Sequence, residues 1–358
     1  MIRFGIGRRI RDAVDKTLGL PSAQHKTPSA LRRTGLSILR AALFYAAFSF
    51  LYLCWNLPLG FLGYRIERSY GFATYGLGLW TMDRVRGYLI GLLTVPAVWL
   101  GYLLLERSPR KWWLWLWLAS IPWTVAMTVA SPLLVLRAYN RFEPLPPSPL
   151  RERLLILAQK AGIGDAKVYR VDSSKRTTKV NAYVAGIGPT KRIVIWDTTL
   201  RAMPEDQIVA IVGHEIGHFV LRHVWWNVVI GIPGMLLFLW LLSRVLPLAI
   251  EKIGTKAGAR NLHDIAGLPL AMLILNVFLF IQTPVESAIS RYEEREADKF
   301  GLELTHLNEP TAQAFISFVE SNYADPDPPK FIVFWFYSHP PLRERVEFAL
   351  EYHPWQGH

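Results

Sequence analysis

The chain has 358 residues, of which 51% are hydrophobic and 19% are charged. That is too apolar for an ordinary soluble protein, so the apolar residues must be segregated. Lysine and arginine outnumber aspartate and glutamate by 40 to 28, yet no zinc-knuckle cysteines or RNA-binding aromatic motif accompany this charge, which favours anionic lipid over nucleic acid as partner. The single cysteine, Cys54, excludes an intramolecular disulfide and a cysteine-rich metal site.

Residues 1–40 form a strongly basic N-terminal arm with nine lysines and arginines against Asp12 and Asp15. Its apolar residues could form one face of a surface helix, and disorder is an equal alternative for so polar a segment. These apolar residues are Ile2, Phe4, Ile6, Ile10, Val14 and Leu18. A cleavable signal peptide is not expected, because the apolar stretch begins only after Arg40 and lacks a small-residue cleavage site.

Five segments are long and apolar enough for the roughly 20 residues that a membrane-spanning helix needs. Three lie in region 41–136, at 41–62, 88–105 and 112–136, with a polar loop at 64–87. Two more lie in region 224–285, at 224–248 and 265–285, separated by a basic loop that holds Lys252, Lys256 and Arg260. The sequence therefore predicts a multi-pass membrane protein.

Regions 137–223 and 286–358 have the mixed composition of a folded extramembrane part. A proline-rich linker, EPLPPSPLRER, leads into a segment with helical spacing at 150–161. Alternating or β-rich runs predict strands at 166–171, 180–186 and 192–196. These elements come directly before the most informative helix of the chain.

That helix contains IVAIVGHEIGHFVLRH, in which His214, Glu215 and His218 form an HExxH motif. Residues four apart share a helix face, so both imidazoles can bind one zinc ion while Glu215 lies beside them. Pro204, followed by two acidic residues, suits the start of this helix. His223, just past the motif, is interpreted as a polar residue at the membrane boundary with no required role.

A catalytic zinc needs a third protein ligand and one open position. In SRYEEREADKF, helical spacing places Glu294 and Asp298 on one face, so Glu294 could bind the ion while Asp298 orients a ligand. His339, in SHPPL, is the rival ligand, and spacing alone leaves the choice open.

Five ordered motifs resemble those of the type-one CaaX prenyl endopeptidases, which are integral-membrane gluzincins with bacterial relatives. They are SKRTTKVNAYVAG, KRIVIWDTTL, VGHEIGHFVLRH, SRYEEREADKF and YSHPPLRERV. The connection LPLGFLGYRIERSYGFATYGLGLWTMDRVRG is also similar, so the resemblance covers about residues 45–350. The sequence departs from the family at Ala73, where an asparagine is usual, and in having five expected spans where eukaryotic members have seven.

The resemblance implies that His214, His218 and Glu294 bind one zinc ion per chain, with Asp298 behind a zinc-binding histidine. It implies that Glu215 is the general base, and that Asn181, Ala182 and Tyr183, on the strand of the NAY motif, receive the peptide along its edge. His339 would contact the substrate and stabilise the oxyanion. The expected fold is a mainly α polytopic membrane protein with a small α+β gluzincin-type zinc metallopeptidase domain.

The expected function is an integral-membrane zinc metalloendopeptidase that hydrolyses a peptide or protein substrate, either prenylated or membrane-embedded. The ion would activate a water molecule and polarise the scissile carbonyl, while Glu215 takes the proton. A protease that removes misfolded membrane proteins is the first alternative, and a non-catalytic transporter or scaffold is the second. The expected location is the lipid bilayer of a bacterial inner membrane.

The side of the membrane that holds the active site follows from the charges of the connecting segments. The basic arm, the turn ERSPRK and the loop with Lys252 should lie in the cytoplasm. Because three spans lie between the basic arm and the HExxH helix, the active site would then lie on the opposite side of the membrane, outside the cytoplasm. The eukaryotic family places its catalytic face in the cytosol, so the resemblance implies the opposite orientation.

Overall fold

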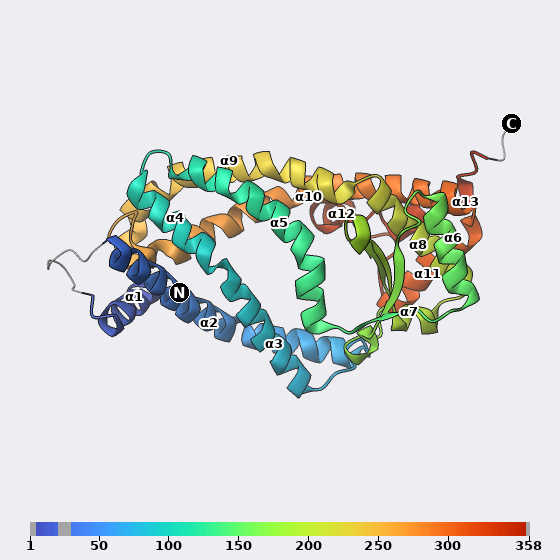
Figure 1. Ribbon diagram of the computed structural model, residues 1–358, viewed down its shortest axis with the longest axis horizontal. Helices are drawn as coiled ribbons and strands as arrows, with labels where there is room; N and C mark the ends of the chain where they lie inside the picture. Colours follow the sequence, from blue (N-terminus) through green and yellow to red (C-terminus); the bar gives the residue numbers. More distant parts are fainter. Residues whose placement is uncertain (1–4, 21–29, 356–358) are drawn as a thin grey trace. The chain divides into compact units, whose positions relative to one another are not determined.

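The computed structural model describes residues 5–20 and 30–355, and these residues are mostly helical (Figure 1). The chain divides into two compact units. Unit 1 contains Met1–Gly63, Gly78–Val125 and Ile230–Phe280, and unit 2 contains Tyr64–Leu77, Ala126–Val229 and Ile281–His358. The predicted fold class is confirmed: membrane-length helices are combined with a small mixed sheet.

Five helical segments among the described residues are long and apolar enough to cross a membrane, which is the predicted number. They are Thr34–Ser69, Leu77–Arg107, Trp112–Ala130, His223–Gly254 and Ile265–Thr305. The corresponding elements are α2 (Ala30–Ser69), α3 (Leu77–Gly91), η2 (Leu92–Thr94), α4 (Val95–Arg107), α5 (Trp112–Tyr139), α9 (His223–Ala257), η5 (Ile265–Gly267) and α10 (Leu268–Thr305). The predicted polar loop at 64–87 is wrong in its bounds, because helices extend to Ser69 and begin again at Leu77.

Several of these helices exceed the thickness of a bilayer. The 38 residues of α10 would extend about 57 Å at 1.5 Å per residue, against a hydrocarbon core of about 30 Å. Pro284 lies within α10 without ending it. The expected fifth span and the acidic segment that follows it are therefore parts of one helix.

The basic N-terminal arm contains a helix, α1 (Ile6–Thr17), which packs within unit 1. Ile10 and Val14 are buried against Ile265 of η5. The buried Arg11 guanidinium forms an ion pair with Asp264. The helical alternative thus holds for residues 6–17, whereas Ile2, Phe4, Arg3 and Lys26 lie outside the described residues.

Unit 2 contains a four-stranded sheet with strand order β1-β2-β4-β3. Its strands are β1 (Phe142–Pro144), β2 (Lys167–Val171), β3 (Ala182–Ala185) and β4 (Arg192–Trp196). β2 and β4 are parallel, and the other two pairs are antiparallel. The three predicted strands are present, although β3 is shorter than predicted. Because β3 is the last strand in the order, one of its edges is open within the described sheet.

The core of unit 2 lies between this sheet and the helices that pack on it (Figure 1). Leu154 of α6 (Pro149–Lys160) and Val212 of α8 (Glu205–Val220) are fully buried with Ile193 of β4. The remaining elements of unit 2 are η3 (Ser173–Lys175), η4 (Gly188–Thr190), α7 (Asp197–Ala202), α11 (Asn308–Asn322), α12 (Lys330–Phe336) and α13 (Leu342–Glu351). In this core α8 packs against the sheet.

Candidate metal centre

Helix α8 carries the HExxH motif and is fixed by its apolar face. The helix starts directly after Pro204, as predicted, and Glu205 and Asp206 occupy its first turn. Val212 and Ile216 are completely buried in the core. The opposite face therefore presents His214, Glu215 and His218 to the space beside α10.

Small residues allow α8 and α10 to approach closely. A Cβ atom at Gly301 of α10 would lie 2.8 Å from the His214 main-chain nitrogen. A Cβ atom at Gly217 of α8 would lie 3.2 Å from Ala297 Cα. The glycines that lower the helix propensity of the motif thus permit the contact that brings both helices to one site.

His214, His218 and Glu294 come together at this contact. His214 Nε2 lies 3.1 Å from His218 Nε2, and the two Glu294 oxygens lie 3.4 Å from His214 Nε2 and 3.2 Å from His218 Nε2. Two ligand atoms about 2.0–2.1 Å from a tetrahedral metal are about 3.3 Å apart. The two imidazole nitrogens and the Glu294 carboxylate are therefore spaced as three ligands of a four-coordinate metal site would be, with one position left open.

Two further observations fit a divalent cation. The donor atoms of these three residues lie within 4.8 Å of one another, and they form the one such group found in the described part of the chain. Glu294 Oε2 is buried, and its contacts with the His214 and Arg345 side chains, at 3.4 and 3.3 Å, are longer and poorer than normal hydrogen bonds. A buried carboxylate is costly unless positive charge lies close to it, which suits this oxygen to a metal ion.

Asp298 lies behind His214. Its Oδ1 is 2.8 Å from His214 Nδ1, on the side of the ring away from the cluster. Burial lowers the pKa of His214, but the hydrogen bonds to Asp298 and Glu294 outweigh it and raise the pKa to about 10. In the metal-free protein this imidazole is therefore a cation at neutral pH, and a metal ion must displace its proton.

Arg345 of α13 joins the two carboxylates of α10. Its side chain donates hydrogen bonds of 2.8 and 2.6 Å to Asp298, and it lies 3.3 Å from Glu294 Oε2. The guanidinium also stacks 4.2 Å from the ring centroid of Phe315. Arg345 is 6% exposed, so it neutralises buried negative charge that would otherwise destabilise the fold.

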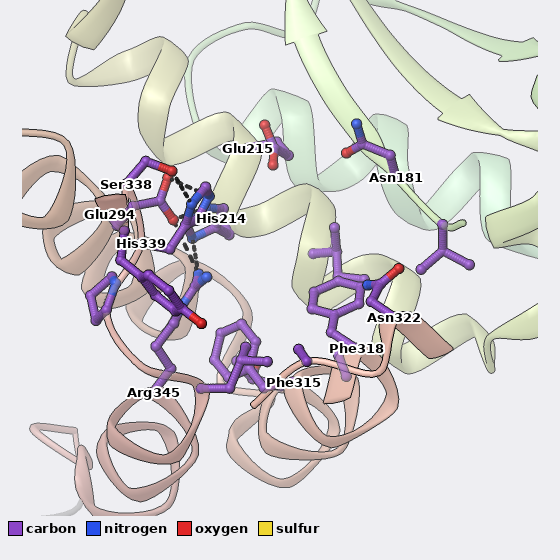
Figure 2. A pocket seen from close by; sticks show the side chains of 18 of the residues that line it. Asn181, His214, Glu215, Glu294, Phe315, Phe318, Asn322, Ser338, His339 and Arg345 are labelled. Carbon is purple, nitrogen blue, oxygen red and sulfur yellow. Dashed lines mark hydrogen bonds and ion pairs between the residues drawn. The ribbon is translucent and has the colours of Figure 1, made fainter. Parts of the chain in front are cut away.

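Glu215, the expected general base, lines the same pocket as two of the candidate metal ligands. It lines a pocket of ≈ 440 Å³ together with His214, Glu294 and Asn181. Figure 2 shows Glu215 and Asn181 along one wall and Phe315 and Phe318 along the other. Burial raises the pKa of Glu215 above the ordinary carboxyl value, against the opposing effect of the two histidines.

The open edge of β3 leads into this pocket. The Asn181 carbonyl accepts a hydrogen bond from Trp196 N–H, and its N–H donates to Thr199 Oγ1. Both groups are thus already paired, the carbonyl with β4 and the N–H with α7. Main-chain groups alternate sides along a strand, so those of Ala182 and Val184 point to the open edge.

The side chains of the NAY segment have different environments. Asn181 is exposed and lines the pocket. Ala182 is 2% exposed in the core, so only its main chain can reach a substrate. Tyr183 is largely buried, and this burial raises the pKa of its hydroxyl to about 12.

His339 lies at the rim of the site, between α12 and α13 (Figure 2). Its Nε2 is 3.2 Å from Glu294 Oε1, and its Nδ1 is 2.9 Å from Ser338 Oγ. Its side chain is 56% exposed, and it is not part of the three-residue group described above. This placement favours a substrate contact over a metal ligand, although the assignment stays a prediction.

Two residues at this site were not predicted from the sequence. Arg345 lies in the motif YSHPPLRERV, but arginine is so frequent in this chain that nothing local distinguished it. His223, which was interpreted as having no required role, is 7% exposed and its Nδ1 lies 2.8 Å from His218 Nδ1. The five-residue spacing after a metal ligand was the available signal.

Residues 144–353 match the family model described as Peptidase family M48. Residues 4–141 match a model described as CAAX prenyl protease N-terminal, five membrane helices. Both matches agree with the resemblance found in the motifs.

Similar proteins include the uncharacterized metalloprotease YhfN of Bacillus subtilis (strain 168), 34% identical over 82% of this chain and 69% of the relative. The CAAX prenyl protease 1 homolog of Oryza sativa subsp. japonica is 27% identical over 93% of this chain and 79% of the relative. The crystal structure of S. mikatae Ste24p has the same fold, with a TM-score of 0.79 and 22% identity, covering 96% of this chain and 80% of that one.

The peptidase family M48 model covers more than half of the chain. The Bacillus subtilis relative, at 34% identity, aligns with more than two thirds of the chain. This family implies a divalent metal ion and a peptide or protein substrate. The predicted family and enzyme class are confirmed: the chain belongs to peptidase family M48 and is a multi-pass integral-membrane metallopeptidase.

Proposed function

We propose that the protein is a zinc-dependent endopeptidase whose metal is held by His214, His218 and Glu294. The observation that carries this proposal is the spacing of the donor atoms: the two histidine Nε2 atoms are 3.1 Å apart, and each lies 3.2–3.4 Å from one oxygen of the Glu294 carboxylate. Two imidazoles and one carboxylate with an open position are the ligand set of catalytic zinc. When bound, the ion supplies Lewis acidity to the scissile carbonyl and to water.

Side chains around this centre carry out the proton transfer and stabilise the oxyanion. Glu215 takes a proton from the attacking water and delivers it to the leaving amine. Its burial raises its pKa, which makes it a stronger base than an exposed glutamate. His339 at the rim donates to the oxyanion that forms on the substrate carbonyl.

The substrate binds as an extended segment along β3. Main-chain groups of Ala182 and Val184 pair with it by strand addition, and Asn181 contacts it at the pocket. The relatives named CAAX prenyl proteases make prenylated peptides the first substrates to test. A misfolded membrane protein is the alternative, because an open sheet edge binds any extended chain.

Replacement of Glu215 by glutamine tests the mechanism. The amide keeps the size of the side chain but removes the base, so we expect peptide cleavage to fall by about 10²- to 10⁴-fold while zinc remains bound. Metal content and turnover should be measured on the same purified protein. Glu205→Gln, on the exposed first turn of the same helix, is the matched control and should retain activity. Undiminished cleavage by Glu215→Gln would refute the assignment.

A substrate panel separates the two substrate classes. Prenylated CaaX peptides, their unprenylated counterparts and an unfolded membrane protein should be offered to the same preparation. Faster cleavage of the prenylated peptides supports a processing enzyme. Cleavage of the unfolded protein alone supports the alternative, and cleavage of none contradicts the proposed activity.

A further inference from the structure

His218 has a neighbour on the side of its ring that faces away from the metal centre. Its Nε2 faces Glu294 and His214, so its Nδ1 is left for another partner. That partner is His223, whose Nδ1 lies 2.8 Å away. His214 shows the same arrangement, with Nε2 toward the cluster and Nδ1 2.8 Å from Asp298. Each histidine of the motif thus has a polar group behind it.

The main chain is shaped to bring His223 to this position. Helix α8 ends at Val220, and Arg222 adopts a left-handed conformation with φ 61°. That conformation is uncommon for a residue other than glycine. It turns the chain so that His223, the first residue of α9, returns beneath His218. His223 is only 7% exposed, whereas the next residue, Val224, is 57% exposed.

The chemistry of the two rings fixes their roles. An imidazole that binds a metal through Nε2 carries its proton on Nδ1 and donates it to a neighbour. The neighbour must then accept through its own Nδ1 and carry its proton on Nε2. A hydrogen bond of this kind holds the ring orientation of a metal ligand and increases its basicity.

We propose that His223 is a positioning residue for the metal centre, which accepts the Nδ1–H of His218 and thereby sets the tautomer and orientation of that ligand. His223 accepts a hydrogen bond from Nδ1 of His218, as Asp298 does from Nδ1 of His214. The acceptor is a neutral imidazole for His218 and a charged carboxylate for His214. The centre then has a polar partner behind each histidine, one from α9 and one from α10. This inference rests on the proposed function, since it requires a metal at His218.

Zinc affinity of the full-length protein in detergent tests this role, measured by competition with a chromophoric chelator. Replacement of a partner behind a metal ligand weakens metal affinity by about 10- to 100-fold, which we expect for His223→Ala. His223→Asn should restore affinity to within a few-fold of the unaltered protein, because Asn Oδ1 occupies the place of His Nδ1. His223→Gln should not, because its oxygen lies where Nε2 was. Val224→Ala, at the exposed neighbour, should bind zinc as the unaltered protein does.

The asparagine and glutamine variants keep the test decisive if His223→Ala does not fold. Equal zinc affinities for these two variants, or an unchanged affinity in His223→Ala, would overturn the positioning role. A purely structural role would instead lower the melting temperature of the metal-free variants without separating asparagine from glutamine. If the unaltered protein holds no zinc, the proposed function fails; if it holds zinc but the variants do not differ, only this inference fails.

Discussion

Arg345 forms ion pairs with both buried carboxylates of α10 and compensates their negative charge. Asp298 and Glu294 are 3% and 6% exposed, and each would be costly to bury without a cation nearby. The Arg345 guanidinium supplies this positive charge. Arg345 belongs to α13, so its ion pairs also connect the C-terminal part of the unit to α10. A side chain that touches no substrate can thus determine whether the site forms.

We expect Arg345→Ala to destabilise the protein by about 3–5 kcal/mol, the usual cost of removing one partner from a buried charge pair. The loss should be smaller in zinc-loaded protein, because the ion supplies positive charge to Glu294. Thermal unfolding with and without zinc measures both effects. Arg343→Ala, on the same helix but 63% exposed, should cost at most about 1 kcal/mol. Equal effects of the two changes would contradict this role.

The raised pKa of His214 predicts how zinc binding depends on pH. In the metal-free fold His214 loses its proton near pH 10, while zinc binds the neutral ring. Zinc affinity should therefore rise with pH between about 7 and 10, and binding at pH 7 should release close to one proton from this residue. Calorimetry in two buffers with different ionisation enthalpies counts the protons released.

Asp298→Asn tests the cause of this shift, since it removes a charge that raises the pKa of His214. Fewer protons should then be released at pH 7. The sign of the linkage is consistent: a histidine with a raised pKa stabilises the metal-free fold at low pH, and that contribution is lost as pH rises through 10. Proton release that is the same in both proteins would show that Asp298 does not set the pKa.

The spacing of HExxH was enough to predict the helix and the shared face of its two histidines, because both are local properties of the chain. Spacing alone left both Glu294 and His339 available as the third ligand. In the structure Glu294 is buried and belongs to the group of three candidate ligands, whereas the His339 side chain is 56% exposed, so we propose Glu294. Arg345 and His223 escaped prediction because their roles depend on contacts that no periodicity encodes.

At the scale of elements, the contact between α8 and α10 determines the distance between the histidines and Glu294. Gly301→Ala would place a Cβ atom 2.8 Å from the His214 nitrogen, so the helices must move apart. We expect a loss of about 1–3 kcal/mol of stability and about a 100-fold fall in kcat/KM, since a misplacement of about 1 Å has that effect.

Gly231→Ala is the matched control, because nothing lies within 4 Å of a Cβ atom there. It is also in a helix, α9, so both changes add the same methyl group to the same kind of backbone. Activity and unfolding should be measured for both variants. If Gly301→Ala is as active as Gly231→Ala, the helix contact does not control the site.

Hydrophobic pattern predicted β2, β3 and β4 because each has several residues that alternate or are buried. It missed β1, whose three residues include Pro144 and overlap a proline-rich segment. Such a strand is recognisable only from its partner, here β2. Proline at that position agrees with an edge strand, where no ladder donor is needed.

At the scale of the whole molecule, the fold agrees with the order of spans. The connection Tyr64–Leu77 belongs to the same unit as the metal centre, whereas α1 packs with η5 in the other unit. Counting the five spans along the chain, the segment Tyr64–Leu77 and the metal centre each follow an odd number of spans, whereas α1 and η5 each follow an even number. Charge remains the evidence for which side is cytoplasmic.

We expect the metal centre to face away from the cytoplasm, because the segments on the side of α1 are basic. Single cysteines at Lys16 and at Lys160, both exposed, test this in a Cys54→Ala background. An impermeant thiol reagent applied to intact cells should label position 160 and leave position 16 unreacted. The reverse pattern would indicate a cytosolic site, and labelling of both would contradict the five-span arrangement.

The interleaving of the two units has a consequence for biosynthesis. Unit 2 is assembled from three stretches of chain, with segments of unit 1 between them. At about 5–20 residues per second, some 4–15 seconds pass between synthesis of His218 and synthesis of Glu294. During that interval the nascent chain holds the two histidines without Glu294, the carboxylate that we propose as their third partner. The proposed metal centre can therefore form only after the fifth span has been made, and a chain that stops earlier lacks one of its ligands.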